Sequence, residues 1–326
     1  MKKNSKRKSN LKSSLLLLLL LAILLISSSY AWFTANQTVT VSSLQVNVQA
    51  SNGLQISADG TTWKAVLANS DLTGVTPTYA GNTNQIPAEL APVSTIGKVT
   101  NGAMEMFYGT VKTNDAGTYV LEASQETDTR GTTGHYIAFD LFLKVDATTP
   151  IYMTSNSKVA KVGEPDLGLQ NAARVAFVNE GTTAASSSID TIQGLKLTDG
   201  NALIWEPNYD THTNNGVAAA RDTYGITTTT TGGSQLSYNG IKAAIPADAG
   251  VTMIQTTNPS TTYFGAVSPA YKTTNGFTES QSFITLQAGV TKLRVYMWIE
   301  GQDVDCENGA SGTDITFDLQ FTATAP

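Results

Sequence analysis

The chain is poor in the residues on which disulfide-stapled proteins and most enzymes depend. Its 326 residues include one cysteine, Cys306, and two histidines, His135 and His212. A single cysteine excludes a disulfide within the chain, so packing must stabilise the fold. Cys306 has no basic neighbour in the sequence that would lower its pKa, and we therefore expect its thiol to be unreactive.

The patterns of well-known catalytic sites are also missing from the sequence. His135 and His212 lie far apart, and there is no His-Glu-x-x-His pair of the kind that holds zinc in a protease. Neither a glycine-rich phosphate loop nor a Gly-x-Ser-x-Gly nucleophile elbow is present. Repeats of about 20 to 50 residues, which would indicate a solenoid or a propeller, are absent. We predict that the protein is not an enzyme.

Charge is sparse, and its balance is acidic. Charged residues make up 14% of the chain, and the formal net charge is -6. Six of the positive residues precede the first acidic one: Lys2, Lys3, Lys6, Arg7, Lys8 and Lys12. Their removal would take the net charge from -6 to -12. An acidic surface repels nucleic acid and anionic lipid, so we expect no nucleic-acid partner.

The only long apolar run directly follows these positive charges. Leu15 to Ile26 is unbroken by polar residues and leads into three serines. This arrangement is typical of an export signal, and it is shorter than the roughly 20 apolar residues that a spanning helix needs. Ser29 and Ala31 are small residues at the two positions that a signal peptidase reads, which places the cut before Trp32. We expect a secreted protein that meets the membrane only through its leader during export; a retained leader that tethers the chain is the alternative.

The segment after the predicted cut alternates between apolar and polar residues, but its phase changes. Val39 and Val41 share one phase, whereas Leu44, Val46 and Val48 share the other. A change of phase indicates either a bulge within one strand or a break between two. We favour a break, in which residues 32–43 form an arm whose apolar face need not be buried in its own subunit. Residues 44–326 would then form the body.

Two segments of the chain resemble a known family. The sequence Ser-Tyr-Ala-Trp-Phe-Thr at residues 29–34, after a leucine stretch and before a short alternating strand, resembles the TasA and camelysin group of Gram-positive biofilm-matrix proteins. The closing segment, residues 313–324, is similar to the last strand of that family. The resemblance implies a jelly-roll β-sandwich that polymerises into extracellular fibres, with Trp32, Phe33, Val39 and Val41 completing a sheet in the next subunit.

Alternating apolar residues predict a β-sandwich body. The clearest strands are residues 136–145, 292–300 and 315–321, and we expect the last two to form a hairpin. One short helix is expected after Pro165, with Asp166 as its N-cap. Residues 180–280 are rich in Thr, Ser, Asn and Gly, which predicts an insertion of loops and peripheral strands, or a second small lobe. The expected fold class is an all-β, jelly-roll-like β-sandwich with long loop insertions and one short helix.

Two loops carry candidate binding residues. Trp205, Glu206 and Asp210 could present an aromatic ring and carboxylates to a sugar, although carboxylates on a solvated loop would give the same pattern. Asp303, Asp305 and Glu307 crowd carboxylates into one segment, as a Ca²⁺ loop would. Asn308 stands where an EF-hand needs glycine, so a solvated loop is the competing interpretation. No other cofactor is expected.

These patterns together predict a secreted structural protein. We expect it to assemble with copies of itself into matrix or surface fibres by donating its N-terminal strand, because open sheet edges pair with extended segments. Other matrix proteins or glycans are further possible partners. The alternative is a monomeric secreted adhesin or glycan-binding module that uses the Trp205 loop.

Overall fold

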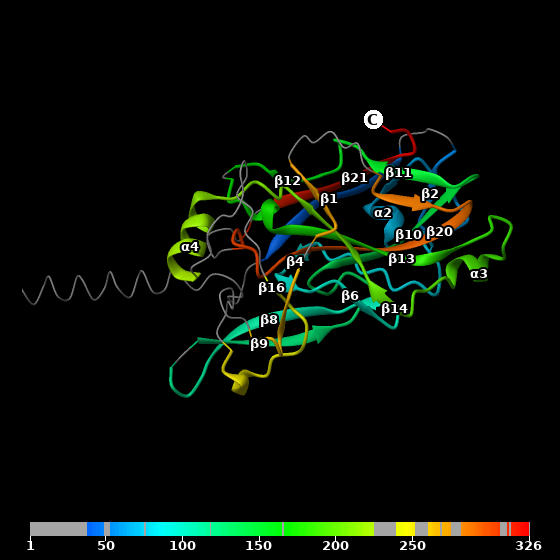
Figure 1. Cartoon of the computed structure of the whole chain (residues 1–326). Coiled ribbons are helices and arrows are strands. Elements are labelled where there is room, and N and C mark those ends of the chain that lie inside the picture. Colours follow the sequence, from blue (N-terminus) through cyan, green and yellow to red (C-terminus); the bar gives the residue numbers. More distant parts are fainter. Residues whose placement is uncertain are drawn as a thin grey trace, which may run out of the picture.

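The computed structural model describes residues 38–48, 53–74, 76–117, 119–164, 166–224, 239–251, 260–267, 269–274, 282–306, 312 and 314–325. The predicted cleavage site, Trp32, Phe33 and Glu307 lie outside these residues. The fold is an all-β sandwich, as predicted from the alternating strands (Figure 1).

The first main sheet joins the two ends of the described chain. Its central pair is β1 (Val39–Val48) and β21 (Asp314–Thr322), which run parallel. On the β1 side the sheet continues with β3 (Val66–Ala68) and β4 (Glu89–Leu90). On the β21 side lie β11 (Thr149–Met153), β12 (Lys158–Val162) and, beyond β11, β19 (Ile284–Leu286).

The second main sheet has six strands in the order β18-β15-β13-β20-β10-β2. Its long central strands are β13 (Ala173–Thr183), β20 (Gly289–Ile299) and β10 (Ile137–Val145), all antiparallel to their neighbours in this group. The edge strands are β2 (Gln55–Ser57), next to β10, and β18 (Tyr271–Thr273); β15 (Leu203–Pro207) lies between β18 and β13.

The main core lies between these two sheets. Side chains of one parity on β10, β20 and β21 enter it, as the period-two patterns predicted. These residues are Ile137, Phe139, Leu141, Leu143 and Val145 from β10; Leu293, Val295, Met297 and Ile299 from β20; and Ile315, Phe317, Leu319 and Phe321 from β21. Full burial of each such side chain contributes about 1.5–3 kcal/mol.

A third layer covers the outer face of the six-stranded sheet (Figure 1). It contains a sheet of β5 (Val93–Ser94), β8 (Met106–Thr113) and β9 (Tyr119–Glu126), and a sheet of β6 (Lys98–Thr100), β7 (Ala103–Met104) and β14 (Asp199–Asn201). Val99, Met104 and Met106 pack there against Tyr296 and Trp298 of β20. The six-stranded sheet is therefore covered on both faces, and every residue of β20 is buried.

Smaller elements complete the fold. A two-stranded sheet of β16 (Asn239–Ile241) and β17 (Phe264–Ala266) supports a further apolar cluster beneath β8 and β9. The helical elements are α2 (Asn69–Leu72), α3 (Ile189–Gln193), α4 (Asn214–Tyr224), and the 3₁₀ turns η1 (Leu169–Ala172) and η2 (Ala247–Ala249).

Three expectations about the body were wrong. Strands β20 and β21 do not form a hairpin, because they lie in different main sheets and pair with other strands. The helix expected after Pro165 is only the 3₁₀ turn η1, whose N-cap is Gly168, while α-helices occur elsewhere. Within residues 180–280, β15 and β18 are strands of a main sheet, with β18 at its edge, and Trp205 of β15 belongs to the main core, so this segment is not merely peripheral.

The phase change near the N-terminus is a bulge rather than a break. β1 runs without interruption from Val39 to Val48, and its register against β21 shifts between Val41 and Ser43. Val39 is fully buried in the main core, opposite Leu90, and Val41 packs at the edge of that core. The expected boundary between an arm of residues 32–43 and a body is therefore corrected: residues 39–43 belong to a strand of the sandwich.

Candidate functional site

The first candidate site is the slot that β1 occupies. Leu44, Val46 and Val48 from β1 are buried, and their strand lies between β21 on one side and β3 and β4 on the other. Removal of β1 would split the seven-stranded sheet and expose the apolar face of Phe317 and Leu319. The slot therefore has the shape and chemistry to receive one extended segment with apolar residues at alternate positions.

The predicted leader, residues 1–31, lies outside the described residues. Signal cleavage at Ser29, Ala31 and Trp32, and the assembly roles of Trp32 and Phe33, thus stay predictions. Within the described part of the chain, no helix combines the length and apolar character needed to cross a membrane.

The expected sugar platform is not on the surface. Trp205 is completely buried in the main core, and its indole N–H donates a hydrogen bond to the Thr273 hydroxyl over 2.8 Å. Glu206 is also buried and contacts Arg174, while Asp210 is half-buried beyond the end of β15. Because the ring has no exposed face, Trp205 cannot stack on a sugar, and this prediction is corrected.

A buried ion cluster joins β13 to the segment after β20. Arg174 Nη2 lies 2.6 Å from Glu206 Oε1 and 2.5 Å from Asp303 Oδ2. Its Nη1 donates to the carbonyl oxygens of Asn171 and Ala173, both at 2.9 Å. The guanidinium thus balances two buried carboxylates that lie far apart in the sequence.

His212 and Asp305 form the neighbouring part of this cluster. His212 Nδ1 lies 2.7 Å from Asp305 Oδ2, while the backbone N–H and the hydroxyl of Thr213 donate to Asp305 Oδ1. Burial alone would lower the pKa of His212, but the hydrogen bond to Asp305 and the negative charge of Asp303 outweigh it and raise that pKa. The pair connects the segment before α4 to the segment after β20.

This cluster contains Asp303 and Asp305, two of the three residues expected to bind metal, together with His212, which was not part of that prediction. Potential ligand atoms of His212, Asp303 and Asp305 lie within 4.8 Å of one another. All four carboxylate oxygens already accept hydrogen bonds or contact a cationic group, including Asp303 Oδ1, which accepts from the Asp305 N–H at 2.9 Å. An imidazole ligand also suits transition metals better than Ca²⁺. The cluster is held together by its own contacts, and calcium binding stays an untested expectation.

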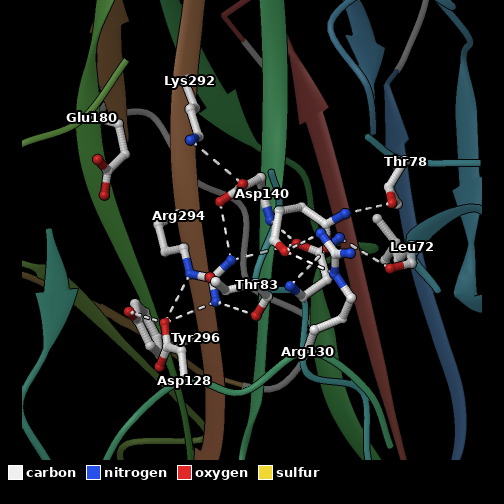
Figure 2. A network of polar contacts seen from close by, with 12 residues as sticks. Leu72, Thr78, Thr83, Asp128, Arg130, Asp140, Glu180, Lys292, Arg294 and Tyr296 are labelled. Atoms are coloured by element: carbon white, nitrogen blue, oxygen red, sulfur yellow. Dashed lines mark hydrogen bonds and ion pairs between the residues drawn. The ribbon is translucent and has the colours of Figure 1, made fainter. Parts of the chain in front are cut away.

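A second polar network lies on the outer face of the six-stranded sheet (Figure 2). Arg294 donates from Nε and Nη2 to Asp128 Oδ2 at 3.0 and 2.8 Å, and from Nη1 to Asp140 Oδ1 at 3.0 Å. Lys292 Nζ lies 3.4 Å from Asp140 Oδ2, which also accepts from the Tyr79 hydroxyl. These residues line a cavity of about 340 Å³.

Little in the amino-acid sequence indicates this network. Arg294 and Lys292 lie on β20, but their acidic partners come from a loop and from β10. Two positive residues spaced by one position within an apolar strand were the available signal, because charges on a covered sheet face need partners.

Comparison of the chain with known protein families, with curated proteins and with solved structures finds no match. The resemblance to the TasA and camelysin group therefore stays a prediction.

Proposed function

We propose that this protein is a secreted, non-enzymatic β-sandwich that assembles into extracellular fibres by strand exchange, each copy placing its β1 in the slot of the next. The proposal rests chiefly on the position of β1. This strand lies inside a sheet, and within the described residues only its C-terminal end is joined to the rest of the sandwich.

Strand exchange would preserve the contacts that β1 makes. A neighbouring β1 could form the same parallel ladder with β21 and bury the same apolar side chains, so the exchanged and closed forms have nearly equal contact energies. The expected arm therefore extends further into the chain than residues 32–43 and includes Leu44, Val46 and Val48. The export signal and the family resemblance support a location outside the cell.

A cysteine pair across β1 and β3 tests this proposal directly. Asn47 and Val66 are opposite each other, and the neighbouring pair carries the Val48 N–H to Ala65 carbonyl hydrogen bond of 2.8 Å. Asn47 and Val66 therefore form a non-hydrogen-bonded pair, whose side chains lie close enough for a disulfide. In assembled protein, Asn47→Cys with Val66→Cys should give a ladder of covalent multimers on a non-reducing gel. Dilute monomer should give an intrachain bond only.

The control pair lies in a hairpin that strand exchange does not open. Thr110 and Glu122 are opposite each other in β8 and β9, and cysteines there should bond within one chain in every sample. Native Cys306 does not interfere, because complete burial, reinforced by nearby carboxylates, raises the pKa of its thiol well above the usual value. Assembled Asn47→Cys/Val66→Cys protein that runs only as monomer would exclude exchange of β1.

Deletion of residues 1–41 is a second test. It removes the buried Val39 and its pairing with β4 but keeps Leu44, Val46 and Val48. We expect a folded protein whose free energy of unfolding is lower by about 1.5–3 kcal/mol, the usual contribution of one buried aliphatic side chain, and whose assembly is weakened but not abolished, because Leu44, Val46 and Val48 remain available for exchange. Urea denaturation and size-exclusion chromatography measure both properties. Loss of cooperative unfolding would mean that residues 39–41 are indispensable to the sandwich.

A further inference from the structure

The polar cavity on the outer face of the six-stranded sheet has the construction of a ligand site. Its floor consists of Asp140, Glu180, Lys292 and Arg294, which come from three adjacent strands and are each at most 8% exposed. Its rim is formed by loops that carry exposed residues, among them Thr127 and Lys196. A buried floor beneath an open polar rim is the usual shape of a small-molecule pocket.

A β-bulge places Glu180 in this floor. Asn179 is opposite Leu293 and Gly181 is opposite Lys292, so Glu180 is the extra residue in the ladder. Gly181 has a φ of 120°, and its N–H donates to the Asn179 side-chain oxygen at 3.0 Å, which stabilises the bulge. In a regular ladder Glu180 and Lys292 would be directly opposite and could form an ion pair. The bulge keeps them apart.

Glu180 and Lys292 consequently have different hydrogen-bond partners. Lys292 Nζ contacts Asp140 and donates to the Gln193 carbonyl oxygen at 3.1 Å. Glu180 Oε2 accepts from the Leu197 N–H at 2.7 Å, whereas Glu180 Oε1 is buried and has no hydrogen-bond partner among the described residues. Figure 2 shows Glu180 beside the network, with no hydrogen bond or ion pair drawn from it to the other residues. A buried oxygen without a donor is costly unless something else supplies one.

The pKa of Glu180 is consistent with a buried carboxyl that forms no ion pair in the described part of the chain. Its burial raises its pKa to about 7, against the opposing effects of the Leu197 hydrogen bond and the positive charge of Lys292. Near neutral pH this carboxyl can therefore accept a hydrogen bond when ionised or donate one when protonated. Groups tuned in this way are concentrated at functional sites.

The mixture of charges in the floor selects the class of ligand. A cationic ligand would be repelled by Lys292 and Arg294, and an anionic ligand by Glu180 and Asp140. A neutral ligand with several hydroxyls avoids both costs, because each hydroxyl can donate and accept. We propose that this cavity binds one saccharide unit, with one hydroxyl bonded to Glu180 and another accepting from Lys292. The ring of Tyr79 lines the same cavity and offers the sugar an apolar contact.

This site is independent of the strand-exchange proposal, and it can be tested on monomeric protein. The probes are D-glucose, D-galactose and N-acetyl-D-glucosamine, observed by saturation-transfer NMR with the full chain. We expect saturation of the ring protons of at least one probe. Glu180→Ala should weaken that binding at least tenfold, because it removes the floor group that the ligand completes. Glu89→Gln, an exposed carboxyl on β4, should leave it unchanged.

A second variant keeps the test valid if Glu180→Ala does not fold correctly. Thr127 is exposed on the rim, so Thr127→Trp should block the cavity without altering its floor, again with at least a tenfold loss of binding. Three results would overturn the proposal: no saturation transfer to any of the sugars, transfer that persists in both variants, or binding of glycine, ethylammonium or acetate in place of the sugars.

Discussion

Replacement of Arg294 by methionine is expected to lower the free energy of unfolding by about 3–5 kcal/mol, the typical result of removing one partner of a buried ion pair. The Arg294 side chain is 4% exposed, and its guanidinium contacts Asp128 and Asp140, which are 7% and 4% exposed. Methionine keeps much of the volume but leaves both carboxylates without their main cation. Urea denaturation at pH 7 measures the change.

The rest of the network cannot replace the lost cation. Asp128 would keep hydrogen bonds from the hydroxyls of Tyr136 and Tyr296, each at 2.8 Å, but these donors carry no charge. Lys292 already lies 3.4 Å from Asp140 and is not near enough to Asp128 to form an ion pair in the described structure. The cost therefore arises from two desolvated negative charges rather than from an apolar cavity.

Two control variants separate charge from packing. Combining Arg294→Met with Asp128→Asn and Asp140→Asn removes the uncompensated charges, and most of the lost stability should return. Lys112→Met breaks an ion pair with Glu122 whose side chains are 54% and 41% exposed, and it should change stability by less than about 1 kcal/mol. A loss below about 1 kcal/mol for Arg294→Met would show that the network contributes little to stability.

Strand positions and their inward faces were predictable from the sequence, but strand partners were not. The alternation in β10, β20 and β21 identifies the core-facing residues, because side chains in a strand alternate between two faces. Alternation carries no information about which strand is the neighbour. β20 and β21 are consecutive in sequence and were expected to pair, yet β20 pairs with β10 and β13, whereas β21 pairs with β1.

The candidate sites were harder to predict because their residues are assembled from distant segments. Arg174 brings Glu206 and Asp303 together, and nothing near any of these residues in the sequence indicates the other two. Trp205 looked exposed because its surroundings are rich in Thr and Asn. The short apolar run Leu203-Ile204-Trp205 was the signal for a buried strand. Burial of Val39 depends on Leu90, which the phase pattern of β1 alone could not reveal.

Stability should fall as the pH rises from about 5 to 8, and Glu300 should account for a large part of the change. Glu300 is completely buried, and this burial raises its pKa from 4.5 to about 7, although hydrogen bonds from Ser94, Trp298 and Gln302 favour the ionised form. A carboxyl with a higher pKa in the folded state binds a proton on folding. Its stabilising contribution is therefore present below the unfolded pKa and is lost as the pH rises through the folded pKa.

The expected contribution of Glu300 to the pH dependence of stability follows from the shift of its pKa. Each pKa unit corresponds to about 1.4 kcal/mol, so Glu300 should contribute about 3 kcal/mol of pH-dependent stability between pH 4.5 and 8. His212 acts in the same direction, because its raised pKa gives stability that is lost as the pH rises through that value. Asp59, with its pKa lowered to about 2, acts only at much lower pH. Maximum stability is thus expected near pH 5.

Glu300→Gln isolates this contribution, since glutamine has the same shape and cannot ionise. Besides Ser94, two donors bond to different oxygens of Glu300: the Trp298 Nε1–H to Oε2 at 3.0 Å and the Gln302 N–H to Oε1 at 3.1 Å. Glutamine has a single side-chain oxygen, which can occupy only one of these two positions. The variant should therefore be less stable than the original protein at pH 5, by about 1–3 kcal/mol for one unsatisfied donor. At pH 8 the difference should disappear or change sign, because only the original protein carries a buried negative charge there.

Urea denaturation at pH 5, 6, 7 and 8 gives the dependence of unfolding free energy on pH for the original protein and for Glu300→Gln. The exposed Glu89→Gln is the control, and its curve should follow that of the original protein. Parallel curves for Glu300→Gln and the original protein would mean that Glu300 is ionised in the folded state throughout this range.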